Sequence, residues 1–234
     1  MNFNNLLIYL IFVAFGGGSL EAQPVKSEIE DFRFRKMAAD SCLQILKKGT
    51  LVVSLPTYSK KIAFLKKAIK DPSTSKLSKK SYIKQLAALE NEIEVLHPNM
   101  LKGMEEFYEY SDFVITYDTF LEDILDGKTG SYFLDKAGNI DSSISFDRKN
   151  YLILRYGTNN ANDVNQKKGF IVTDRHLKDL KSPFPALHSI EKKSLGLNTF
   201  LKPNKNHNIP AQELVQKMND RFFKQTDRIK YQLD

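Results

Sequence analysis

The fold of this chain is decided by residues 45–69, which read ILKKGTLVVSLPTYSKKIAFLKKAI. At the centre of this stretch, Thr50–Leu55 is a short run of apolar and β-branched residues, a composition that favours a β-strand. Gly49 and Pro56 lie on either side of the run and end regular structure there. Because nearly every position is apolar, we expect an interior strand that is buried on both faces of a sheet.

Amphipathic helices are predicted on both sides of this strand. Residues 27–47 and 59–70 carry apolar side chains at spacings of three and four, the period of a helix with one buried face. A longer helix is predicted from Ser78 to Leu96, and His97-Pro98 should end it because proline disfavours helical geometry in the residue before it. Its apolar stripe should pack against the rest of the protein, and consists of Ile83, Leu86, Leu89, Ile93 and Leu96.

Strands dominate the second half of the chain. The pattern predicts strands at 113–117, 151–156 and 169–173, a short helix at 120–125, a hairpin across 131–140, an irregular segment at 183–208 and a closing helix after Pro210. A strand–helix beginning followed by several strands and a helix indicates an α/β sandwich with a mixed sheet. We expect residues 23–234 to form this single domain, with a helical hairpin in the amino-terminal half.

The amino terminus predicts an export signal. Leu6–Phe15 is an unbroken apolar run of the length found in secretory signals, and it is too short to span a membrane. Leu20-Glu21-Ala22 fits the last residues before a cleavage site. We therefore expect residues 1–22 to be a signal peptide, and the mature protein to be periplasmic or secreted, with no transmembrane helix. An uncleaved anchor and a buried amino-terminal helix are the alternatives.

The composition is that of a protein that folds by burying apolar side chains. Of its 234 residues, 41% are hydrophobic and 27% are charged, which is typical of globular domains and not of disordered chains. Cys42 is the only cysteine, so the chain forms no intrachain disulfide. Because Cys42 lies among apolar residues at helical spacing, we expect its thiol to be buried and inert.

Five stretches of the chain resemble a family of exported bacterial proteins of unknown function. They read ILKKGTLVVSLPTYSKKIAFLKKAI, DFVITYD, NYLILRYGT, GFIVTDRHLKDLKSPFP and AQELVQKMNDRFFKQ. Proteins of this family have a similar strand before a lysine-rich helix pair, a glycine-started strand that leads to Pro-Phe-Pro, and a similar closing helix. The resemblance covers about residues 45–224 and implies export and this order of elements. It implies no catalytic residue or ligand, and the segment after Pro-Phe-Pro departs from an aromatic-rich continuation.

Lysines gather in residues 59–84, which contain nine lysines and one acidic residue, Asp71. The chain has a formal net charge of +7, and loss of Glu21 with the signal raises it to +8. Residues 85–109 have the opposite sign, with six glutamates and Lys102. One interpretation is the solvated face of a helical hairpin whose two ends differ in charge.

The other interpretation is a surface that contacts an anionic component of the cell envelope. Phosphorylated lipid headgroups and acidic glycans are candidate partners, as is a protein, and attraction to an anionic membrane is worth on the order of 1 kcal/mol per nearby lysine. The candidate residues are Lys60, Lys61, Lys66, Lys67, Lys70, Lys79 and Lys80. We expect no nucleic-acid partner, because the aromatic residues alternate within strands and form no stacking platform.

Signals for catalysis are sparse. Asp174 and His176 form the best acid–base pair, at the end of a predicted strand, although this pattern is also typical of a turn. Tyr117 and Asp118 follow another strand. The four histidines show no metal-binding spacing, and GxSxG, P-loop and GxGxxG motifs are missing from the sequence, so we expect no metal or cofactor.

Two hypotheses therefore remain, from different classes of protein. The first, which we favour, is a noncatalytic binding protein of the cell envelope that acts through the lysine-rich hairpin or through residues 183–208. The second is an envelope enzyme whose polar site lies near the strand ends at 117–118 and 174–176. A concave site that gathers these strand ends would favour the enzyme.

Overall fold

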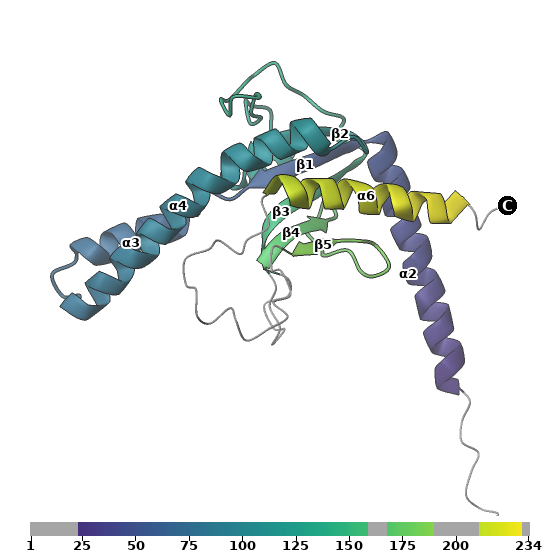
Figure 1. Ribbon diagram of the computed structural model, residues 1–234, viewed down its shortest axis with the longest axis horizontal. Helices are drawn as coiled ribbons and strands as arrows, with labels where there is room; N and C mark the ends of the chain where they lie inside the picture. Colours follow the sequence, from purple (N-terminus) through teal and green to yellow (C-terminus); the bar gives the residue numbers. More distant parts are fainter. Residues whose placement is uncertain (1–22, 159–167, 190–210, 231–234) are drawn as a thin grey trace, which may run out of the picture.

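The computed structural model describes residues 23–158, 168–189 and 211–230, so the predicted signal peptide lies outside the described residues (Figure 1). The elements are α2 (Gln23–Lys48), β1 (Thr50–Leu55), α3 (Ser59–Lys70), α4 (Lys76–Phe107), β2 (Asp112–Tyr117), η1 (Asp118–Phe120), α5 (Leu121–Leu125), β3 (Tyr151–Thr158), β4 (Lys168–Thr173), β5 (Leu187–Ser189) and α6 (Ala211–Lys230). The predicted helices and strands on either side of Gly49 are present.

Strand β1 occupies the interior of a mixed five-stranded sheet. The strand order is β2-β1-β3-β4-β5, in which β1 is parallel to both neighbours while β4 and β5 are antiparallel to the strands before them. All six residues of β1 are buried. The sequence predictions of a mixed sheet and of a two-sided buried strand at 50–55 are confirmed.

Two apolar clusters hold the layers together. On one face, α2, α4 and α6 cover the sheet, and Leu51, Val53 and Leu55 of β1 contribute to the main core. On the other face, Val52 belongs to a smaller cluster that includes Leu121 of α5. Successive side chains of β1 therefore point to opposite faces of the sheet and contribute to both clusters. The protein is a single-domain α/β fold.

Helix α4 is longer than the sequence predicted, because it continues through Pro98 to Phe107. Proline inside a helix costs about 3 kcal/mol, since it lacks the N–H of an intrahelical hydrogen bond. Met100 and Met104 lie beyond it and are fully buried in the main core. Burial of a methionine side chain stabilises by roughly 1.5–3 kcal/mol, so these two contacts offset the proline.

The expected hairpin at 131–140 is present in a short form, with one antiparallel bridge between Leu134 and Ile140. Asp135 holds its turn by accepting backbone hydrogen bonds at 2.9 and 2.8 Å. One further prediction needs correction. The expected irregular segment 183–208 contains β5, whose backbone pairs with β4. The rest of that segment, residues 190–208, lies outside the described residues.

The Cys42 thiol is partly buried against the main core, and burial together with the nearby charge of Asp174 raises its pKa. A raised pKa lowers the fraction of reactive thiolate, in agreement with the expected inert thiol. Within the described ranges, each helix is too short or too polar to cross a lipid bilayer.

Candidate functional site

The sheet separates the residues that the sequence suggested as a catalytic site. Tyr117 and Asp118 lie at and just after the carboxyl end of β2, beside the same end of the parallel strand β1. Strand β4 is antiparallel to β3, and its carboxyl end pairs near the start of β3. Asp174 and His176 follow β4 and therefore lie at the opposite end of the strands from Tyr117 and Asp118. The four residues do not form one site.

Both aspartates of this suggested site shape loops. Asp118 Oδ1 accepts hydrogen bonds from the Thr57 backbone N–H at 3.0 Å and from its hydroxyl at 2.5 Å, which ties the end of β2 to the loop after β1. Asp174 Oδ1 accepts hydrogen bonds from the backbone N–H groups of His176 and Lys178, at 2.8 and 2.9 Å. This second pattern is the turn chemistry that the sequence offered as its alternative to catalysis.

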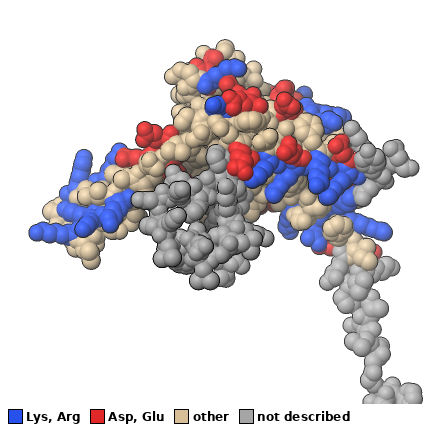
Figure 2. Space-filling view, in the orientation of Figure 1, with Lys and Arg blue, Asp and Glu red and all other residues tan. Residues whose placement is uncertain are grey.

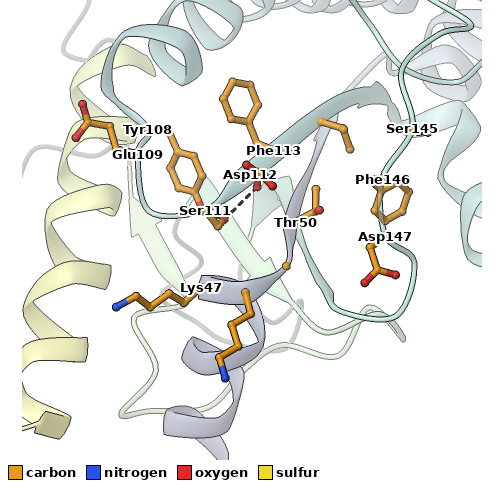
Figure 3. Close-up of a pocket in the computed structure, with 13 residues that line it drawn as sticks. Lys47, Thr50, Tyr108, Glu109, Ser111, Asp112, Phe113, Ser145, Phe146 and Asp147 are labelled. Atoms are coloured by element: carbon orange, nitrogen blue, oxygen red, sulfur yellow. Dashed lines mark hydrogen bonds between the residues drawn. The ribbon is translucent and has the colours of Figure 1, made fainter.

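A hollow of about 910 Å³ lies at the amino ends of β1 and β2 (Figure 3). The Tyr108 and Ser111 hydroxyls on its wall bond each other at 2.8 Å, and Ser111 also donates to the Asp112 carbonyl at 3.1 Å. Its charged residues have both signs: Lys47, Lys48, Glu109, Asp112 and Asp147. In Figure 3, Lys47, Glu109 and Asp147 point in different directions. Charged side chains of one sign therefore do not gather around a common point, as a binding site for an ion would require. In the part of the chain that the structure describes, no group of His, Cys, Asp and Glu could hold a metal ion.

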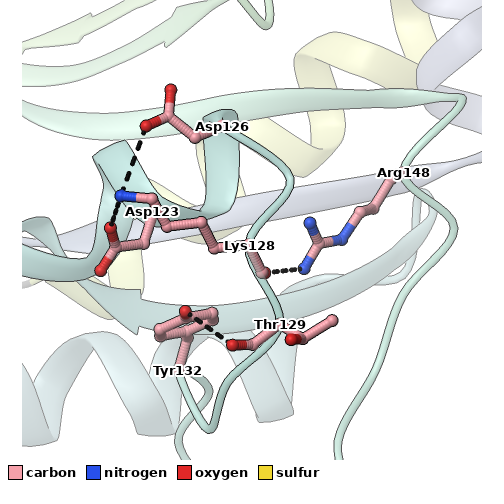
Figure 4. A network of polar contacts seen from close by, with 6 residues as sticks. All are labelled: Asp123, Asp126, Lys128, Thr129, Tyr132 and Arg148. Atoms are coloured by element: carbon pink, nitrogen blue, oxygen red, sulfur yellow. Dashed lines mark hydrogen bonds and ion pairs between the residues drawn. The ribbon is translucent and has the colours of Figure 1, made fainter.

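A polar network closes the loop that covers the smaller core (Figure 4). Lys128 Nζ lies 2.6 Å from an oxygen of Asp123 and 3.5 Å from one of Asp126, and Arg148 donates to the Lys128 carbonyl at 2.8 Å. The Tyr132 hydroxyl donates to the Thr129 carbonyl at 3.1 Å. An exposed ion pair contributes about 1 kcal/mol or less to folding stability. The main effect of this network is therefore to fix the conformation of the loop.

The lysine-rich candidate surface is the outer part of a helical hairpin that α3 and α4 form beyond the sheet (Figure 1). We call residues 59–84 the outer hairpin. Figure 2 shows its lysines gathered at the end of the molecule, while acidic residues lie nearer the sheet. All the candidate lysines are exposed except Lys79, which is half-buried. Within the described residues, Lys66 alone among these candidates forms an ion pair, at 3.3 Å from Glu90.

Large apolar side chains are also exposed on the outer hairpin. The exposed fractions are 61% for Phe64, 82% for Leu77 and 53% for Ile83. Ile83 was expected to pack with the rest of its helical stripe, and that expectation is wrong. Leu89 and Leu96 of the stripe are buried, and Leu86 and Ile93 are half-buried.

The base of the hairpin is fixed to the sheet by polar contacts that the sequence did not reveal. The Tyr58 hydroxyl donates to Glu92 at 3.1 Å, and His97 Nε2 lies 2.9 Å from the Pro56 carbonyl oxygen. Burial first, and then the Glu92 carboxylate, raise the pKa of the Tyr58 and Tyr156 phenols, so both stay protonated beside that carboxylate. Only tertiary structure brings these residues together, since they come from a loop, a helix and a strand.

The exposed apolar residues had a weak signal in the sequence. Phe64 lies two positions after Ile62 and so falls off the apolar face of α3, and Leu77 precedes the stripe of α4. A large apolar residue outside the buried stripe of a helix either packs against another segment of the protein or stays exposed to solvent, where it can bind a partner.

Comparison of this chain with family models, with curated proteins and with solved structures found no match. The resemblance to exported bacterial proteins therefore stays a prediction, and a function has to be argued from the structure itself.

Proposed function

We propose that this is an exported, noncatalytic protein that binds an anionic component of the cell envelope through its outer hairpin. The observation that carries this proposal is the concentration of lysines there, on an element that projects from the fold. Residues 59–84 contain nine lysines, eight of them exposed, against one acidic residue. Glu90 lies beyond residue 84 and engages only Lys66 among the candidate lysines in the described structure. Within the part of the chain that the structure describes, the other candidate lysines form no ion pair, which leaves them available to an external anion.

Electrostatic attraction of this kind is strong only when several lysines act together. Each lysine near an anionic membrane contributes on the order of 1 kcal/mol, and charges farther apart than about 10 Å are screened at 0.1 M salt. We therefore expect binding that weakens steeply as salt concentration rises. The separation of Asp118 from Asp174 supports this proposal over the enzymatic alternative, because that alternative required them to share one site.

The test is cosedimentation of residues 23–234 with vesicles of phosphatidylcholine alone and of phosphatidylcholine mixed with phosphatidylglycerol. A soluble acidic polysaccharide is measured in parallel. Binding to the anionic surfaces only, with loss at high salt, is the expected result.

A charge-reversal variant locates the binding surface. It carries Lys61→Glu, Lys67→Glu, Lys80→Glu and Lys84→Glu, and it keeps Lys66 because that side chain pairs with Glu90. We expect a loss of affinity on the order of a hundredfold or more, since four favourable charges become repulsive.

The matched control changes the net charge equally at exposed lysines away from the hairpin: Lys149→Glu, Lys178→Glu, Lys181→Glu and Lys224→Glu. We expect this control to bind far better than the hairpin variant. Equal losses in the two variants would show that net charge alone, without a defined surface, controls binding.

A further inference from the structure

We infer that the anionic component is a lipid bilayer, and that Phe64 and Leu77 enter its headgroup–acyl boundary while the surrounding lysines bind the headgroups. This inference rests on the proposed function and names its partner. The Leu77 side chain is 82% exposed and the Phe64 side chain is 61% exposed. Exposure of apolar side chains to water is unfavourable. A surface that bound its partner through charge alone would need only the lysines.

Helical geometry places lysines around each of these apolar side chains. Residues three and four apart lie on the same face of a helix, so Lys60, Lys61 and Lys67 share the face of Phe64 on α3. On α4, Lys80 and Lys84 lie three and seven positions after Leu77 and share its face. Each of the two apolar side chains therefore lies among lysines of its own helix face.

A bilayer surface matches this arrangement, because it has anionic headgroups above an apolar layer. Lysine can place its hydrocarbon stem along the apolar layer and its ammonium group among the headgroups. An interfacial helix uses this combination of a basic face and inserted apolar side chains. A soluble acidic polysaccharide offers no hydrocarbon layer, and Leu77 would stay exposed in that complex.

The hairpin is held in a fixed geometry, so the apolar residues are presented before binding. The Phe64 and Tyr82 rings pack edge to face with centroids 6.3 Å apart, which joins α3 to α4. At the base, the contacts of Tyr58 and His97 hold the hairpin against the sheet. With a rise of 1.5 Å per residue, the start of α4 lies roughly 30 Å along the helix from His97. The sheet would then stand clear of the bilayer.

Substitution of the apolar residues measures their part in binding. Leu77→Ser should lower the affinity for anionic vesicles on the order of tenfold, because most of this exposed leucine would be buried in the interface. Phe64→Ser should act in the same direction. Because Leu77 is almost fully exposed, Leu77→Ser should leave the fold intact, which the far-ultraviolet circular dichroism spectrum checks. Ile140→Ser, at an apolar residue 50% exposed and distant from the hairpin, should bind as the wild type does.

Tryptophan fluorescence tests insertion directly, since the chain contains no tryptophan. In Leu77→Trp, anionic vesicles should shift the emission to shorter wavelength, and lipids brominated on their acyl chains should quench it. Ile140→Trp is the matched control, and its emission should not change with either vesicle.

The outcomes separate this inference from the proposed function. If the lysine variant loses vesicle binding while Leu77→Ser and Phe64→Ser bind like the wild type and Leu77→Trp is not quenched, the insertion is refuted and the ionic function stands. Lysine-dependent binding to acidic polysaccharide without vesicle binding also refutes the bilayer and keeps the function. Binding to neither anionic partner refutes both.

Discussion

The buried histidine on β5 predicts that acid destabilises this protein through one side chain. His188 is 2% exposed and packs edge to face against Phe222 of α6, with ring centroids 5.9 Å apart. Among the described residues, neither ring nitrogen has a hydrogen-bond partner of good geometry, although the Pro185 carbonyl lies near. Burial first, and then the charge of Arg221, lower the pKa of His188 from 6.5 to about 4.

The sign of the effect follows from proton binding in the two states. Between pH 6.5 and about 4, the unfolded chain binds a proton at His188 and the folded protein does not, so stability rises with pH in this window. The contribution is fully present above pH 6.5 and is lost as the pH falls through about 4. One pKa unit corresponds to about 1.4 kcal/mol, so acidification from pH 7.5 to 5 should remove about 2 kcal/mol of folding free energy.

Urea unfolding at pH 7.5 and at pH 5, followed by circular dichroism, measures this loss in the wild type and in His188→Leu. Leucine has a similar volume and does not titrate, so His188→Leu should lose about 2 kcal/mol less than the wild type over this range. At pH 7.5 we expect the variant to be as stable as the wild type or more stable, since a buried polar ring without good partners is replaced by an apolar side chain. His176→Gln, in the exposed turn after β4, is the control and should keep the wild-type loss. An equal loss of folding free energy on acidification in His188→Leu and in the wild type would show that His188 is not the source of the acid sensitivity.

Three other outcomes are expected. Gly49→Ala should destabilise the fold by more than about 2 kcal/mol in urea unfolding, because its Cβ would collide with the backbone carbonyl of Asn150; a wild-type midpoint would contradict the close approach. Tyr58→Phe should cost about 1–2 kcal/mol by removing a hydrogen bond to a half-buried carboxylate, and should add little to Glu92→Ala in a double-mutant cycle; fully additive effects would mean that the two side chains do not interact. Amino-terminal sequencing of protein from fractionated cells should find Gln23 first in the exported fraction, and full-length protein in the cytosol would refute the signal peptide.

Local patterns predicted most of the helices and strands. The apolar run at 50–55 predicted a strand buried on both faces, and the run at 169–173 predicted another strand, as the structure has them. Residues 59–70 likewise form the expected helix. These predictions succeed because a side chain's place on a helix or strand depends on spacing along a short segment.

Predictions made from short segments failed where contacts with residues far along the chain decide the structure. Pro98 should end a helix, but Met100 and Met104 beyond it are buried against the core, which keeps α4 helical. Ile83 belongs to an apolar stripe, but no element of the described structure covers it. Spacing shows which residues of a segment share a face, and it does not show whether another segment lies opposite that face.

The α/β class, the order of the elements around Gly49 and the concentration of lysine in residues 59–84 can all be read from the order of the amino acids. The antiparallel direction of β4 relative to β3 depends on the folded chain, and it places Asp174 at the other end of the strands from Asp118. The folded chain likewise places the lysines on a projecting hairpin with exposed Phe64 and Leu77. The reason is physical: spacing along the chain sets the form of each segment, while strand direction and exposure depend on contacts between residues far apart in the chain.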